Sequence, residues 1–146
     1  MHRTLRTLAL SLSVFGVAAV SSHAETSIPT PHADAAATTS IYAGYSKAGY
    51  ARSSGSSWNV YEDYSKVGYL RRSGSNWNIY EGYSKVGYTR RSGERWNCYA
   101  GYSNIGYTRQ SYGTKWNIYA DYSRVGDARG LQAGPVGCAA LVLGLV

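Results

Sequence analysis

Tyrosines and arginines that recur at a fixed spacing are the side chains of this chain most able to do chemistry. A motif of 19 or 20 residues repeats along it, and in each copy a tyrosine beside a turn is followed seven residues later by an arginine. Aromatic rings can stack on sugars, and guanidinium groups bind anions. The pattern therefore predicts a repeated binding surface. The candidate ligand-binding residues are Tyr45, Tyr64, Tyr83, Tyr102, Tyr122, Arg52, Arg71, Arg90 and Arg109.

Residues suited to catalysis are scarce in the repeats. The three histidines, His2, His23 and His32, all precede them, so a Ser-His or Cys-His pair and a His/Cys zinc site are not expected there. Carboxylate pairs could in principle cleave sugars, but Glu62 and Glu81 fill a repeat position that is alanine in other copies. We therefore expect no enzyme activity, no cofactor and no metal.

The aromatic residues have two interpretations. Repeated tryptophans and tyrosines usually pack a core, and we expect this of the tryptophans. The chain has 15 tyrosines, more than so small a core can hide with satisfied hydroxyls, so those beside the turns could pack or bind. Neutral or anionic glycans are the expected ligands, and a scaffold or protein-interaction ring is the alternative. Alternating basic and aromatic residues would also suit nucleic acid, which export makes improbable.

The first residues have the features of a secretory signal. Met1 to Arg6 is basic, Thr7 to Val20 is largely apolar, and small residues at 22 and 24 favour cleavage after about Ala24. A retained membrane anchor would need a longer apolar span. We expect a periplasmic or secreted protein with residues 1–24 removed, which lowers the net charge from +7 to +5. Residues 25–40 read as a disordered linker before a domain at 41–146.

Each copy of the motif predicts two short β-strands with a turn at both ends. Apolar and polar residues alternate with period two, as in Trp77 to Glu81 and Val86 to Arg90. This places every tryptophan on one face with the residue two positions later, and that face is the expected core. The aligned pairs are Trp58 with Val60, Trp77 with Ile79, Trp96 with Cys98 and Trp116 with Ile118.

The repeats are expected to close into a ring. An isolated hairpin is marginal in water, and the first and last copies are incomplete in complementary ways. The tail, residues 130–146, has no charge and would not stay exposed. We expect residues 139–145 to fill the centre as a plug or central strand. A membrane-spanning tail would need a longer stretch without Pro135 and the glycines.

The recurring W-N-[VI]-Y-x-x-Y-S-K-V-G-Y-x-R motif, followed by an apolar tail, resembles the bacterial β-flower repeat proteins. The resemblance covers residues 41–146 and implies a closed all-β fold of about five hairpins around a pseudo-symmetry axis, in the five-fold form. It implies no activity or ligand residues. The chain departs from the pattern at Tyr112, which is inserted, at Asp127, which replaces a tyrosine, and at Pro135, where a fifth tryptophan would fall.

Two cysteines in an exported chain make a disulfide plausible. Cys98 occupies an inward position of its repeat, and Cys138 lies in the tail assigned to the interior. A bridge between them is the candidate disulfide, and two buried cysteines without a bond are the alternative.

Overall fold

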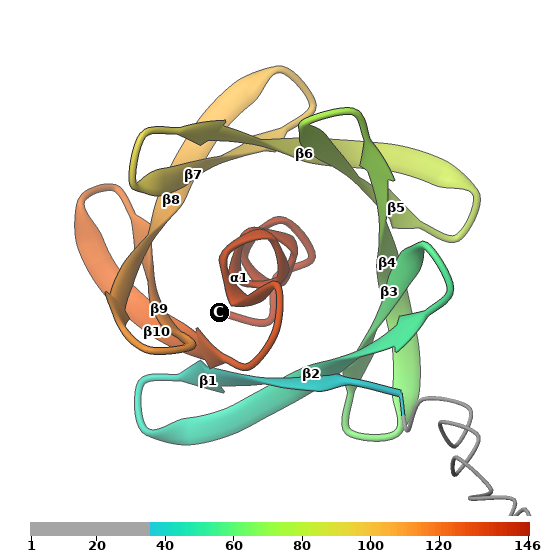
Figure 1. Cartoon of the computed structure of the whole chain (residues 1–146), viewed down its shortest axis with the longest axis horizontal. Helices are drawn as coiled ribbons and strands as arrows, with labels where there is room; N and C mark the ends of the chain where they lie inside the picture. The colour runs from blue at the N-terminus through green and yellow to red at the C-terminus, as the bar shows by residue number, and fades with distance from the viewer. Residues whose placement is uncertain (1–35) are drawn as a thin grey trace, which may run out of the picture. The chain divides into compact units, whose positions relative to one another are not determined.

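The computed structural model describes residues 36–146 as ten strands and one helix (Figure 1). The expected signal segment and residues 25–35 of the expected linker lie outside the described residues. No helix of the described part is long and apolar enough to span a membrane. The elements are β1 (Thr38–Ala43), β2 (Ser46–Ser54), β3 (Ser57–Glu62), β4 (Ser65–Ser73), β5 (Asn76–Glu81), β6 (Ser84–Ser92), β7 (Arg95–Ala100), β8 (Ser103–Tyr112), β9 (Lys115–Ala120), β10 (Ser123–Arg129) and α1 (Ala133–Val142).

The strands form a closed antiparallel barrel. Each pairs with its neighbours in the chain, and β1 closes the barrel against β10 with Ile41 opposite Ala128. The prediction of a closed all-β fold built from hairpins is confirmed. Closure leaves no open sheet edge.

The barrel begins earlier than expected. Strand β1 starts at Thr38, so the last residues of the expected 25–40 linker belong to the sheet, and Thr39 is fully buried. The boundary at residue 41 was wrong because Thr38, Thr39 and Ser40 carry no aromatic or strongly apolar signal. Their strand conformation comes from pairing with β2, which involves all three residues, and with β10, where Ser40 lies opposite Arg129.

Nine two-residue turns connect the strands, and the first residue of each turn has positive φ, which glycine and, less readily, aspartate adopt. The turns after β1, β3, β5, β7 and β9 each carry a tyrosine and define what we call the tyrosine end of the barrel. The turns after β2, β4, β6 and β8 define the opposite, arginine end. The first turn residues are Gly44, Asp63, Gly82, Gly101 and Asp121 at the tyrosine end and Gly55, Gly74, Gly93 and Gly113 at the arginine end.

The tail lies inside the barrel, as expected, but as a helix (Figure 1). Every residue of α1 from Ala133 to Ala140 is buried. The alternative of a central strand was wrong. A lone strand inside a closed barrel would leave its backbone groups unpaired, whereas a helix satisfies its own. Pro135 is tolerated because it stands in the first turn, where its missing N–H has no intrahelical partner.

Side chains of the inner face and of α1 make a single core. It includes the predicted face: Trp58, Trp77 and Trp96 are buried, Trp116 is partly buried, and the residues two positions later are fully buried. The position of a fifth tryptophan is taken by Thr39 in β1, because Thr39 opposes Ala51 as Trp58 opposes Leu70. Pro135, expected at that position, lies in α1 instead.

A ring of glycines lets the helix end approach the wall closely. A Cβ added at Gly87 would lie 2.1 Å from the carbonyl oxygen of Tyr99 and 3.0 Å from Val142. The equivalent glycines of the other repeats each lie against a different residue of the same apolar segment. Five glycines at one repeat position therefore contact three leucines and two valines. These contacts are Gly49 with Leu145, Gly68 with Leu143, Gly106 with Leu141 and Gly126 with Val146.

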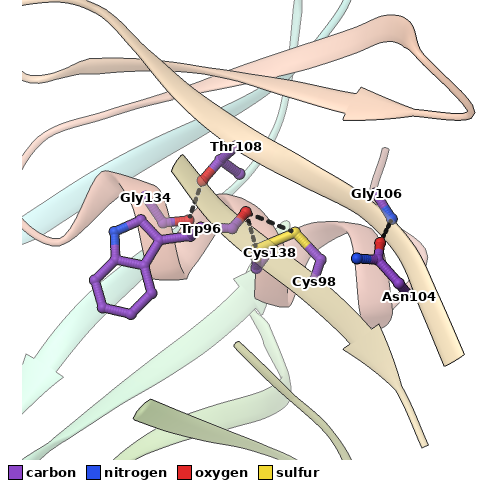
Figure 2. Close-up of a disulfide and its surroundings, with 7 residues drawn as sticks. All are labelled: Trp96, Cys98, Asn104, Gly106, Thr108, Gly134 and Cys138. Atoms are coloured by element: carbon purple, nitrogen blue, oxygen red, sulfur yellow. Dashed lines mark hydrogen bonds between the residues drawn. A yellow bond between two sulfur atoms is a disulfide. The ribbon is translucent and has the colours of Figure 1, made fainter. Parts of the chain in front are cut away.

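A disulfide ties the helix to the wall. Cys98 of β7 is bonded to Cys138 of α1, and both are fully buried, so the bridge that the sequence left open is present (Figure 2). On the neighbouring strand, the Thr108 hydroxyl donates a hydrogen bond to the carbonyl oxygen of Gly134 over 3.0 Å. These two contacts fix both the depth and the rotation of α1.

Candidate functional site

The five turn tyrosines are fully open to solvent. The exposed fractions of Tyr45, Tyr64, Tyr83, Tyr102 and Tyr122 lie between 91% and 103%. The sequence left packing and binding open for these residues, and neighbouring hairpins do not cover them. Each of these tyrosines lies in the two-residue turn at the tip of a hairpin. The hairpin tips project outward around the barrel (Figure 1). Repeated exposed aromatic rings at matched positions are typical of a binding surface.

A second set of tyrosines stacks in pairs on the outer wall. Tyr50 of β2 faces Tyr61 of β3, with ring centroids 4.9 Å apart and nearly parallel planes. Such stacking fixes the ring orientation. The same pair recurs three times between neighbouring hairpins, as Tyr69 with Tyr80, Tyr88 with Tyr99 and Tyr107 with Tyr119.

Lysines lie beside three of these stacks. The Nζ atom of Lys66 is 5.0 Å from the centroid of Tyr69, and Lys47 and Lys85 hold the same place near Tyr50 and Tyr88 at 5.7 and 5.4 Å. The lysine ammonium is thus drawn to the ring by a cation–π contact and remains exposed. These lysines were not among the predicted binding residues, although each stands two residues after a turn tyrosine in the sequence.

Open grooves form where a hairpin tip meets the preceding hairpin. One, of about 210 Å³, is lined by Lys47, Tyr50 and the backbone between them, with Asp63 and Tyr64 on its far side. A second, of about 320 Å³, repeats it with Lys66, Tyr69, Gly82 and Tyr83. A third, of about 290 Å³, has Asn104 in place of lysine, beside Tyr107 and Tyr122. We call these the tyrosine grooves.

β-Bulges position the tips that form the grooves. In each even-numbered strand one residue has no partner across the hairpin; in β6 this residue is Val86 and in β10 it is Val125. A bulge bends the strand and redirects a backbone group. The Val86 carbonyl accepts a hydrogen bond from Gly101 N at 2.8 Å, and the Val125 carbonyl accepts one from Gly44 N at 3.1 Å. The tip backbone is therefore fixed while its tyrosine remains free.

The structure does not bring the candidate arginines to the turn tyrosines. Arg52, Arg71, Arg90 and Arg109 are each the seventh residue of an even-numbered strand, so about 20 Å of strand separates each from the tyrosine at that strand's start. Arg109 instead lines an open cavity of about 410 Å³ at the arginine end with Arg95 and Asn97. The turn tyrosines and the candidate arginines thus lie toward opposite ends of the barrel, while Arg95 and Asn97 line both this cavity and the third tyrosine groove.

One buried carboxylate interrupts the repeated stacks. Asp127 is 1% exposed and accepts hydrogen bonds from Arg129 Nε at 2.6 Å and Arg124 Nη2 at 2.9 Å. Burial alone would raise the pKa of Asp127, but the bond from Arg129 and the charges of Arg129, Lys115 and Arg124 outweigh it and hold that pKa below its usual value. The same contact raises the pKa of Arg129. This cluster is structural, because both arginines are already engaged.

Chemically, the tyrosine grooves offer groups that are suited to binding. They combine aromatic faces with an amine or amide and backbone groups. In residues 36–146 no three His, Cys, Asp or Glu side chains gather as a metal site would require. The chain matches no family model, no curated protein and no solved structure. The site must therefore be interpreted from its own geometry.

Proposed function

We propose that this protein is an exported, non-enzymatic binding module that holds glycans of the cell envelope or the extracellular space in its tyrosine grooves. The observation that carries the proposal is the pairing of a free tyrosine ring, such as Tyr64, with Lys47 and Tyr50 in an open groove that recurs around the barrel. Neutral glycans use the rings, and anionic glycans use the lysines as well.

Groove chemistry supports a sugar ligand. The apolar face of a sugar ring stacks on an aromatic ring, while its hydroxyls need donors and acceptors at the edge. Tyr83 supplies such a ring, and Lys66 with the backbone around Gly68 supplies polar groups in the same groove. The shallow, open shape suits an internal unit of a polymer, because both chain directions remain free.

Repetition supports a polymeric ligand. A single shallow groove holds a sugar weakly, but several grooves on one rigid ring raise the apparent affinity when one chain reaches more than one of them. We further propose that the repeats form the five-fold ring of the β-flower type, with one groove for each junction between hairpins. The two junctions not covered by the three grooves described above carry residues at the matching positions. These are Lys85 with Tyr102, and Arg124 with Tyr45.

A glycan array with the purified protein lacking residues 1–24 tests the proposal. We expect binding by the parent protein and its loss in a Tyr64→Ala, Tyr83→Ala, Tyr102→Ala triple variant. Because these rings are exposed, the variant should keep the melting temperature of the parent. Tyr112→Ala is the control, since Tyr112 is also largely exposed but lies at the arginine end. Absence of parent binding to both neutral and anionic glycans would overturn the proposal in favour of a scaffold or protein-interaction ring.

A further inference from the structure

Charge is distributed unequally between the two ends of the barrel. At the tyrosine end, basic and acidic side chains balance. Among the described residues at the arginine end, nine side chains are basic and one, Glu94, is acidic. Asp127 lies in the middle of β10 and is paired with Arg124 and Arg129. The balanced set is Lys47, Lys66, Lys85 and Arg124 with Glu62, Asp63, Glu81 and Asp121; the unbalanced set is Arg52, Arg71, Arg72, Arg90, Arg91, Arg95, Arg109, Lys115 and Arg129.

Five of these arginines form a regular girdle. Each is the seventh residue of an even-numbered strand, and the residue before it is buried, so the arginine points outward. All five are exposed, and of these five only Arg129 forms an ion pair within residues 36–146, with Asp127. Two strand spacings separate neighbours, or about 10 Å across the sheet. We call Arg52, Arg71, Arg90, Arg109 and Arg129 the arginine girdle.

Like charges face each other directly within this region. Arg95 of β7 lies opposite Arg109 of β8, and Lys115 of β9 lies opposite Arg129 of β10. Like charges directly opposite each other destabilise a sheet. The Asp127 carboxylate already offsets the second pair, through its ion pair with Arg129. The cavity of about 410 Å³ beside Arg95 and Arg109 is also lined by Ser92, Gly93, Glu94 and Asn97. The two guanidinium groups outnumber the one carboxylate, and Asn97 and Ser92 can donate further hydrogen bonds. Two guanidinium groups on one open cavity suit a sulfate, phosphate or carboxylate group.

We propose that the arginine girdle is a second binding surface, separate from the tyrosine grooves, that takes a linear polyanion. Four girdle arginines without an ion pair in residues 36–146 lie on successive even-numbered strands of the outer wall, so a flexible chain following the wall meets one after another. These are Arg52, Arg71, Arg90 and Arg109, whereas the charge of Arg129 is already paired with Asp127. A flat anionic membrane would reach only the arginines on one side. The inference does not depend on sugar binding at the tyrosine end.

The test compares two triple variants with the same loss of charge. Arg71→Gln, Arg90→Gln, Arg109→Gln changes the girdle, and Lys47→Gln, Lys66→Gln, Lys85→Gln changes the tyrosine end. With polyphosphate as probe and inorganic phosphate as control, we expect the girdle variant to lose at least about tenfold in affinity and to show a weaker salt dependence. The lysine variant should stay near the parent with this probe, because polyphosphate has no sugar ring for the tyrosine grooves to hold. Poly(vinyl sulfate) and polyacrylate, used in the same way, distinguish sulfate and carboxylate groups from phosphate.

Each other outcome would overturn the proposal. Equal losses in both variants would mean that net charge alone attracts the polymer, and no loss in either would remove the girdle as its site. Binding of the parent to phosphatidylglycerol vesicles but to none of the three polyanions would assign the girdle to a membrane surface. The Tyr64→Ala, Tyr83→Ala, Tyr102→Ala variant should keep its polyphosphate affinity, because polyphosphate contains no sugar ring, so failure of the glycan proposal remains distinguishable.

Discussion

Asp127 lies opposite Tyr42 across the β1–β10 pairing, where each of the other four junctions between hairpins places one tyrosine opposite another. The Arg129 guanidinium, hydrogen-bonded to Asp127, lies 4.3 Å from the centroid of the Tyr42 ring. At the junction that closes the barrel, an ion pair and a cation–π contact therefore replace a stacked pair.

Asp127→Asn should destabilise the barrel in a pH-dependent way. The pKa of Asp127 is lowered in the folded protein, so its contribution is fully present above the unfolded value of about 3.9 and is lost as the pH falls through the lower folded value. Near neutral pH we expect the free energy of unfolding to fall by about 1–2 kcal/mol. The decrease is no larger because the partner arginines are half exposed and solvent screens their charges. Urea unfolding of the parent and the variant from pH 7 to pH 2 measures this decrease. A difference in free energy of unfolding between the two proteins that stays constant across that range would contradict this account.

Loss of the disulfide should lower the free energy of unfolding without changing the fold. Cys98 and Cys138 are 40 residues apart, and a loop of that size corresponds to about 3–4 kcal/mol in the chain-entropy description. We expect this decrease in urea unfolding of a Cys98→Ala, Cys138→Ala variant. Dithiothreitol should produce a similar decrease in the parent and none in the variant. An unchanged midpoint in both experiments would show that the helix is held without the bond.

Deletion of residues 139–146 should unfold or aggregate the domain. The segment fills the tyrosine end of the barrel, where Leu141 and Leu143 contact the wall glycines. Without it, the fully buried side chains of Ile41 and Ile79 would face an empty interior. Circular dichroism melting and size-exclusion chromatography measure the result. A truncated protein that melts like the parent would refute the role of the tail.

Gly87→Ala should lower the free energy of unfolding by at least about 2 kcal/mol. The new methyl group would collide with the backbone carbonyl of Tyr99, and this carbonyl cannot move without disrupting the sheet. Ala48→Val is the matched control. Position 48 belongs to the unpaired bulge residues, and the equivalent residues 67, 86 and 125 are already valine, so we expect a change within about 0.5 kcal/mol. Thermal melting of both variants compares them directly. Equal melting temperatures would mean that the wall can shift to make room.

Sequence periodicity predicted the strands and the core, because in every repeat the next inward-facing residue follows the tryptophan by two positions. It did not predict α1, since glycines and a proline interrupt residues 130–146 and the surrounding wall stabilises the helix. Thr39 was missed for a related reason: it replaces a tryptophan where the chain enters the barrel, and Gly130 packs against it. The exposure of Tyr64 depends on how one hairpin tip packs against its neighbour. The sequence of one repeat does not determine that packing, so the exposure could not be predicted.

The helix follows all ten strands in the chain, and this order has a consequence for biogenesis. Every hairpin must leave the ribosome, and in an exported protein cross the membrane, before the segment that fills the interior exists. Until then the Cys98 thiol lacks its partner Cys138 and the inner tryptophans lack the helix, and until β10 is made the edge of β1 that it covers stays open. Folding should therefore be a late, all-or-none event, and the unfinished chain is the form that most needs a chaperone.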